Sequence, residues 1–228
     1  MLSAIAIVPS APVMVPELAS GAADELADLR QAVVTAAAAL PARFVAIGVG
    51  LADAVVGPTA AGTFAGYGVD VRITLSPVAI GAPAELPLCA LIAGWVRGRG
   101  NPEAHAEVRV YSADHDADAA VAHGRQLRAE IDEAADPVGV LVVADGAHTL
   151  TAAAPGGYDP GSIPVQAALE DALGAGDAAA LTGLPDTVVG RVAYQVLAGL
   201  TDPGSRPAKV LYRGAPYGVG YFVGVWQP

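Results

Sequence analysis

Two kinds of segment alternate along the chain. Short runs rich in Val, Ile and Ala, such as VGVLVVA at residues 138–144, are apolar throughout. Such runs are typical of strands that are buried on both faces of a parallel sheet. This pattern predicts strands at residues 2–8, 43–49, 69–74, 107–112, 138–144, 208–213 and 218–226. The longer Ala-rich stretches between them predict helices at residues 22–40, 85–97, 116–135, 163–174, 177–183 and 186–200.

The alternation of strands and helices indicates right-handed crossovers and a layered α/β fold. Asp114 or Asp116 is placed to cap the helix that follows, and Gly-Ala-Gly at residues 174–176 marks the end of one helix and the start of another. No linker, charge run or internal repeat divides the sequence. We therefore expect a single domain over residues 1–228, with a mainly parallel central sheet flanked by helices.

The composition is apolar without indicating a membrane protein. Hydrophobic residues make up 54% of the chain and the mean hydropathy is +0.48, but Ala and Val supply most of that excess. No run approaches the ~20 uninterrupted apolar residues that a spanning helix needs. The opening stretch lacks a basic segment and is broken by Pro9, Pro12 and Pro16, so we interpret it as a strand and a loop, not a signal peptide. We expect a soluble, cytoplasmic protein.

The charge and the cysteine count exclude several classes of partner and site. The net charge is −11, and the 12 Lys and Arg residues are scattered. Nucleic acid and anionic lipid require clustered basic side chains, so neither is an expected partner. The acidity is explained by solubility more simply than by an acidic docking surface. One cysteine, Cys89, allows neither an internal disulfide framework nor a cysteine-based zinc site.

Candidate chemistry gathers in loops that follow predicted strands. In layered α/β sheets, ligands bind beyond the carboxyl ends of the strands. Three loops qualify, at residues 9–21, 50–66 and 145–161. The third begins with Asp145 and His148, three residues apart. It continues with Tyr158 and Asp159.

The four histidines differ in their sequence surroundings. His148 directly follows a strand that we expect to be buried, which leaves open both a catalytic role and a structural hydrogen-bonding role. His105, His115 and His123 fall in or beside polar, acidic segments, so we predict that they face solvent.

Five of the twelve aromatic residues lie in the last 17 positions of the chain. They are Tyr212, Tyr217, Tyr221, Phe222 and Trp226. Such side chains fill the core of a C-terminal hairpin, or they line a ring-binding pocket or a dimer surface. We favour the core.

Three segments together resemble a known family. The first is residues 7–12 (IVPSAP) with residues 15–18 (VPEL), and the second is residues 145–151 (DGAHTLT) with residues 155–160 (PGGYDP). The third is residues 215–222 (APYGVGYF). In this order they are similar to segments of the class III extradiol ring-cleavage dioxygenase superfamily of LigB type, which also contains Memo-like proteins. The resemblance implies a LigB-like α/β domain over the whole chain.

The resemblance also implies what this chain lacks. Active relatives bind Fe(II) through two histidines and one carboxylate, leaving open positions for a catechol and for O₂. Ser10 stands at the first histidine position, and the region of the second runs from Gly50 to Asp53. No Asp or Glu follows Asp202 to supply a C-terminal carboxylate. We therefore expect no bound iron and no other cofactor.

His148 matches the acid/base histidine of active relatives, and we regard it as retained from a dismantled site with Asp145 beside it. The resemblance places further residues in the pocket: Ser10, Pro12, Gly50, Asp53, Tyr158 and Asp159.

Three hypotheses follow from the missing triad. In the first, the protein is inactive in ring cleavage and binds a small molecule, aromatic or other, or a protein partner, which includes a second copy of itself. In the second, it is an enzyme with a rebuilt site around His148 and Asp145. Asp159 and Asp53 then join them on a different metal, or the chemistry is metal-free acid/base catalysis. In the third, the chain is a structural subunit of a hetero-complex.

Overall fold

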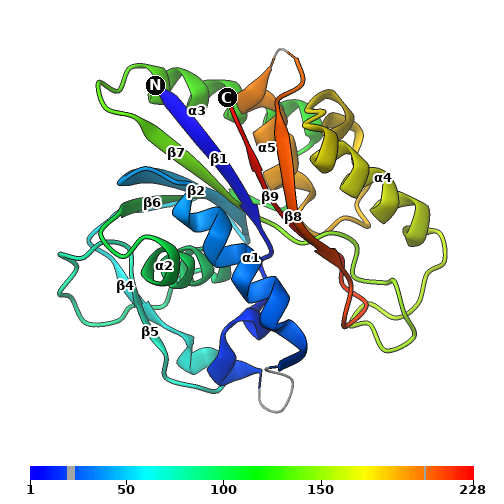
Figure 1. Cartoon of the computed structure of the whole chain (residues 1–228), viewed down its shortest axis with the longest axis horizontal. Coiled ribbons are helices and arrows are strands. Elements are labelled where there is room, and N and C mark those ends of the chain that lie inside the picture. Colours follow the sequence, from blue (N-terminus) through cyan, green and yellow to red (C-terminus); the bar gives the residue numbers. More distant parts are fainter. Residues whose placement is uncertain (20–23, 203) are drawn as a thin grey trace.

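A computed structural model describes residues 1–19, 24–202 and 204–228 (Figure 1). A seven-stranded sheet in the order β3-β6-β2-β7-β1-β9-β8 forms its centre. Its strands are β1 (Leu2–Val8), β2 (Arg43–Gly50), β3 (Ala54–Val56), β6 (His105–Ser112), β7 (Val138–Val143), β8 (Ala208–Gly214) and β9 (Tyr221–Trp226). A separate two-stranded sheet pairs β4 (Ala61–Thr63) with β5 (Arg72–Thr74).

The middle of the large sheet is parallel and its edges are antiparallel. Strands β6, β2, β7 and β1 pair parallel with one another. Strand β3 pairs antiparallel with β6, and β9 pairs antiparallel with both β1 and β8. All six residues of β7 are buried, as expected for a strand covered on both faces. The expected α/β fold is therefore present, with a mixed sheet whose four central strands are parallel.

Helices cover both faces of the sheet. The α-helices are α1 (Ala27–Ala38), α2 (Leu88–Gly100), α3 (Ala117–Asp132), α4 (Ser162–Ala175) and α5 (Arg191–Thr201). Short 3₁₀ helices are η1 (Pro12–Met14), η2 (Pro16–Leu18), η4 (Asp24–Leu26), η5 (Phe64–Tyr67) and η6 (Ala179–Gly183). Helices α1 and α2 pack on one face, in front of the sheet in Figure 1, whereas α3, α4 and α5 pack on the other. No helix among the described residues is long and apolar enough to cross a membrane.

The alternation of side chains along β1 divides the core in two. Ile5 and Ile7 belong to the cluster beneath α3, α4 and α5, whereas Ala6 and Val8 belong to the cluster beneath α1 and α2. All four are fully buried. This division follows from the strand geometry, because successive side chains point to opposite faces of a sheet.

Most predicted strands are confirmed, with two shortened. The predicted strand 69–74 begins only at Arg72, because η5 occupies the residues before the Gly68 turn. The predicted strand 218–226 begins only at Tyr221. Gly218 has a φ of +72°, which is a turn conformation and not an extended one. Strands β3 and β4 were not predicted, since each has three residues and carries no periodic pattern.

The predicted helices differ from the structure mainly at their starts. Residues 22–23 of the predicted helix 22–40, and the end of the predicted loop 9–21, lie outside the described residues. The predicted helix 186–200 begins only at Arg191. The predicted helix 177–183 is the 3₁₀ helix η6. Asp116 caps α3 as predicted, with its Oδ1 accepting a hydrogen bond of 2.8 Å from the backbone N of Ala119.

A close helix crossing fixes the position of α3. A Cβ atom at Gly124 would lie 2.1 Å from the carbonyl oxygen of Val196 on α5, and one at Gly199 would lie 2.0 Å from that of Val121. Only glycines permit backbones to approach so closely. The crossing therefore holds the first half of α3, including His123, in a defined place above the sheet.

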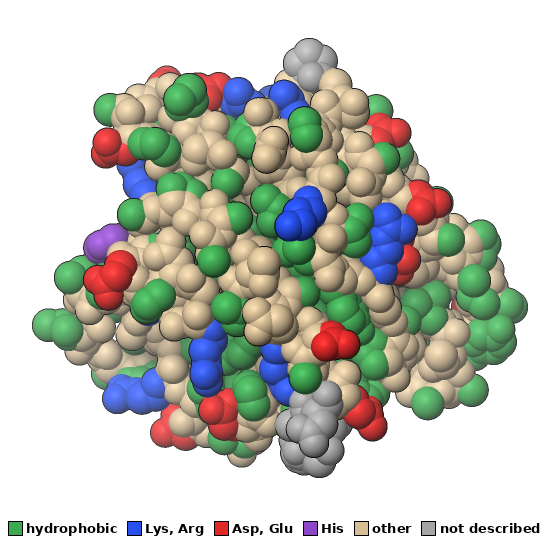
Figure 2. All heavy atoms as spheres, in the orientation of Figure 1, with side chains coloured by type: hydrophobic (Ala, Val, Ile, Leu, Met, Phe, Trp, Pro, Cys, Tyr) green, Lys and Arg blue, Asp and Glu red, His purple; other side chains and the backbone are tan. Residues whose placement is uncertain are grey.

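Basic and acidic side chains are interspersed on the face shown in Figure 2, and neither sign gathers into a large patch there. Over the whole molecule, seven Arg–carboxylate pairs and the His115–Asp53 pair occur among the described residues, and most of these pairs are partly exposed. Exposed pairs of this kind contribute at most about 1 kcal/mol each.

Candidate functional site

The carboxyl ends of β1, β2, β6 and β7 meet at one edge of the sheet because these four strands are parallel. The loops after them carry the polar residues that the structure gathers into two groups. The first surrounds a cavity beside Asp145, which follows β7, and we call it the Asp145 cavity. The second consists of Asp53, His115 and His123, and we call it the Asp53 cluster.

The Asp145 cavity has a volume of about 440 Å³. Apart from Asp145, its walls are mainly apolar and aromatic, with Pro12, Val13, Leu18, Tyr217, Val219 and Tyr221 among them. The backbone N of Ser10, two residues after β1, donates a hydrogen bond of 2.8 Å to Oδ1 of Asp145. The structure thus brings the predicted catalytic residue Asp145 together with two of the predicted pocket residues, Ser10 and Pro12.

Burial raises the pKa of Asp145 to about 7, and the hydrogen bond from Ser10 only partly opposes this shift. At neutral pH the carboxyl group is therefore poised between a protonated and an ionised state. Burial also raises the pKa of the Tyr221 phenol, so this side chain stays protonated. The cavity combines a carboxyl group that changes its charge near neutrality with a hydroxyl group that does not.

Phe222 and Trp226 fill the core, as predicted for the C-terminal aromatic residues. The indole N of Trp226 donates a hydrogen bond of 2.8 Å to the carbonyl oxygen of Leu173. Tyr217 and Tyr221 also line the Asp145 cavity, so part of the same hairpin forms a pocket wall.

His148 does not line this cavity. Gly156 packs against its ring so closely that a Cβ there would lie 2.5 Å from both Cδ2 and Nε2. Its Nδ1 is buried and has no hydrogen-bond partner among the described residues. The side chain therefore lies under the loop after β7, and no hydrogen bond joins it to Asp145 among the described residues.

The other predicted pocket residues also lie outside the Asp145 cavity. Tyr158 is exposed. Asp159 accepts hydrogen bonds from the backbone N of Gly161 at 2.9 Å and from the hydroxyl group of Ser162 at 3.3 Å, which supports the start of α4. Gly50 ends β2 with no room for a side chain, because a Cβ there would lie 2.5 Å from Cγ1 of Val110.

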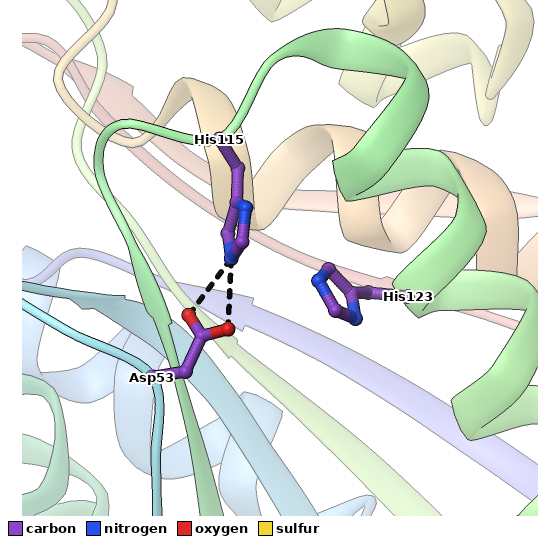
Figure 3. Close-up of side chains that lie close together, drawn as sticks. All are labelled: Asp53, His115 and His123. Carbon is purple, nitrogen blue, oxygen red and sulfur yellow. Dashed lines mark hydrogen bonds and ion pairs between the residues drawn. The ribbon is translucent and has the colours of Figure 1, made fainter.

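Asp53, the remaining predicted pocket residue, is part of the second group (Figure 3). Nε2 of His115 lies 2.8 Å from Oδ1 and 2.9 Å from Oδ2 of its carboxylate. His123 points toward both from α3, and its ring centroid lies 4.7 Å from that of His115. In the rebuilt-site hypothesis, Asp53 joins Asp145, His148 and Asp159. In the structure its neighbours are instead the imidazoles of His115 and His123.

The prediction that His115 and His123 face solvent is confirmed only in part. Both are half-buried, and the side chain of His115 is 22% exposed. His105 is exposed, as predicted. The sequence contained a signal for the pair: His115 directly precedes the cap of α3, and His123 follows that cap by two helical turns, which places both near one end of the helix.

The backbone supports the carboxylate of Asp53. The N of Ser112 donates a hydrogen bond of 2.7 Å to its Oδ1. This bond, together with His115 and against a smaller effect of burial, lowers the pKa of Asp53 below its ordinary value. Asp53 is thus held ionised, in contrast to Asp145.

Comparisons with known proteins support the fold alone. No protein-family model and no curated protein sequence matches the chain. The crystal structure of the uncharacterized protein JW3007 from Escherichia coli K12 is similar, with a TM-score of 0.58. The alignment covers 99% of this chain and 100% of that one, at 13% sequence identity. At this identity the similarity extends to the α/β architecture and not to an activity.

Proposed function

We propose that this protein binds a small, largely apolar molecule with a hydroxyl or comparable polar group in the Asp145 cavity. In this proposal its scaffold is of LigB type and lacks extradiol ring-cleavage activity. The observation that carries the proposal is a half-buried carboxyl group with a pKa near 7, set among apolar and aromatic walls. Ligand pockets commonly combine such walls with a few polar groups that orient the ligand.

The residues around the cavity do not fit the Fe(II) site of active LigB relatives. Such a site needs two imidazoles and a carboxylate around one ion. The cavity offers one carboxyl group and no histidine among its lining residues. Ser10 contributes its backbone N–H to Asp145, and a donor of this kind is no metal ligand. Ring cleavage through iron at this place is therefore not part of the proposal.

The cavity favours an aromatic or alicyclic alcohol. A volume of about 440 Å³ accommodates a single ring with substituents. Apolar walls stabilise the ring by about 25 cal/mol for each Å² of apolar surface removed from water. Asp145 accepts a hydrogen bond from the ligand hydroxyl when ionised, and either accepts or donates one when protonated.

Acid/base catalysis by Asp145 is the second candidate. Its pKa near 7 is the value at which a general acid or base works best at neutral pH. This candidate keeps the acid/base role of Asp145 from the rebuilt-site hypothesis, without requiring that His148 reach the ligand. It differs from the first in that the bound molecule is converted.

The test is binding of a small panel by ligand-observed NMR at pH 6 and pH 8. The panel contains phenol, catechol, cyclohexanol and benzoate, and each compound is incubated with the wild type, Asp145→Asn and Asp171→Asn. Asp171 is an exposed aspartate on α4 that pairs with Arg213, so it serves as the matched control.

We expect a hydroxylated ring to bind the wild type and the control equally, and to bind Asp145→Asn about tenfold more weakly or without its pH dependence. Recovery of the ligand unchanged supports the binding function, and conversion that Asp145→Asn abolishes supports catalysis. Absence of binding by every compound, or equal loss in both variants, would contradict the proposal.

A further inference from the structure

The Asp53 cluster assembles three metal-ligating groups from three elements. Asp53 lies between β2 and β3, His115 lies between β6 and α3, and His123 lies on α3 (Figure 3). One ligand atom from each residue can be chosen so that all lie within 4.8 Å of one another. Around a tetrahedral ion with bonds of about 2.0–2.1 Å, ligand atoms lie about 3.3 Å apart. Small movements of these side chains would therefore bring the three ligand atoms to the spacing of a tetrahedral site.

Groups behind the ligands already orient two of them. The backbone N of Ser112 holds Oδ1 of Asp53. Arg191, which is paired with Asp186, donates hydrogen bonds to the carbonyl oxygens of His115 at 3.1 Å and Ala113 at 3.3 Å. Metal ligands in proteins are commonly fixed by such supporting hydrogen bonds. The turn that presents His115 is thus anchored independently of any ion.

His123 is held by packing. Its ring lies 5.2 Å from that of Tyr111 on β6, measured between centroids. The neighbouring residue Gly124 forms the close crossing with α5, so the backbone of α3 cannot move freely at this point. A ring fixed in this way loses little conformational entropy when it binds an ion.

A cavity of about 220 Å³ reaches the cluster from the side of β3 and β6. Asp53 and His123 both line it, together with Tyr111 and Gln126. Arg109, which also lines it, is paired with Glu107 and Glu130, so its charge is already compensated. Three protein ligands leave at least one coordination position open, and here that position has space beside it for water or a small polar molecule.

We propose that Asp53, His115 and His123 bind one divalent first-row transition metal ion, with an open coordination position toward this cavity. Two imidazoles and a carboxylate suit Zn²⁺, Fe²⁺ and Co²⁺, whereas Mg²⁺ and Ca²⁺ prefer oxygen ligands alone. The site is separate from the Asp145 cavity and does not depend on the function proposed for it. Without metal, the same residues form the hydrogen-bonded pair of His115 and Asp53 seen here.

The test is calorimetric titration of the chelator-treated full chain with Zn²⁺, and with Co²⁺ so that the visible spectrum reports the coordination. The variants are His123→Ala, His123→Gln and Asp53→Asn. His105→Ala is the matched control, because His105 is an exposed histidine at the start of β6 and is not part of the cluster. Urea unfolding checks each variant, and His123→Gln retains a polar side chain if His123→Ala fails to fold.

We expect one ion per chain, a Co²⁺ spectrum typical of four or five ligands, and an affinity about 100-fold weaker in each cluster variant. His105→Ala and Asp145→Asn should bind the ion like the wild type. Absence of saturable binding at one ion per chain, or an equal loss in His105→Ala, would overturn the proposal. Since Asp145→Asn is the variant that tests the other cavity, failure of one proposal is distinguishable from failure of the other.

Discussion

Asp145 and Asp53 each follow a parallel strand at the same edge of the sheet, but their surroundings are opposite. Asp145 lies beside mainly apolar walls and receives one backbone hydrogen bond, and burial raises its pKa to about 7. Asp53 is half-exposed, receives a backbone hydrogen bond and lies beside two imidazoles, and its pKa is lowered. Each carboxylate accepts a single backbone N–H, so that bond does not explain the difference.

The difference arises from what surrounds each hydrogen-bonded pair. Removal of water penalises the charged form of a carboxyl group, whereas imidazoles and water favour it. The same residue type at equivalent ends of neighbouring strands is therefore suited to two kinds of chemistry. Asp145 is suited to exchanging a proton or binding a neutral ligand, and Asp53 is suited to holding a positive charge.

The largest effect is expected from Asp145→Asn. A raised pKa means that the native state loses stability as the pH rises from about 3.8 to about 7, because ionisation is costlier in the folded chain. Three pKa units correspond to about 4 kcal/mol, which is an upper value for a half-buried group. The neutral amide avoids this cost. We expect the variant to exceed the wild type in stability at pH 8, and the difference to vanish toward pH 4.

Urea unfolding of both proteins between pH 4 and pH 8 measures this difference, and subtracting the two curves removes the contribution of every other titrating group. A difference that does not change with pH would show that Asp145 is not the group that titrates near neutrality.

A smaller effect of opposite sign is expected from Asp53→Asn, measured in the presence of a chelator. A lowered pKa means that the carboxylate stabilises the fold above about pH 3.8, and that this stabilisation is lost as the pH falls. The Asp53 side chain is 50% exposed, so solvent limits the loss in the variant to less than about 1 kcal/mol at neutral pH. If Asp53→Asn lost as much stability at neutral pH as Asp145→Asn is expected to gain at pH 8, the contrast between the two sites would be contradicted.

The sequence predicted the architecture well because burial determines it. Strands such as β7 are apolar at every position, and the centre of a parallel sheet buries such a run on both faces. The elements that the sequence did not predict are short, and each depends on only a few residues. Strand β3 pairs with β6, which is distant in sequence, and β4 is a three-residue strand paired only with the equally short β5. The start of β9 depends on the backbone conformation of Gly218.

The site was predictable only in part, for a similar reason. Ser10, Pro12 and Asp145 lie in loops that follow central strands, and those loops converge by the rules of parallel sheets. His115 and His123 have polar sequence neighbours, which indicated exposure. Their burial comes from the β6 strand and the α5 crossing, which local sequence does not reveal.

The most direct test of the contrast between the two aspartates is a ¹³C NMR titration of the side-chain carboxyl carbons in the labelled protein. Asp145→Asn and Asp53→Asn assign the two signals. We predict that the Asp145 signal titrates with a midpoint near pH 7 and the Asp53 signal below pH 3.8. If Asp145 instead titrates near pH 4, like an ordinary aspartate, the burial of its carboxyl group and the function proposed for the cavity are contradicted.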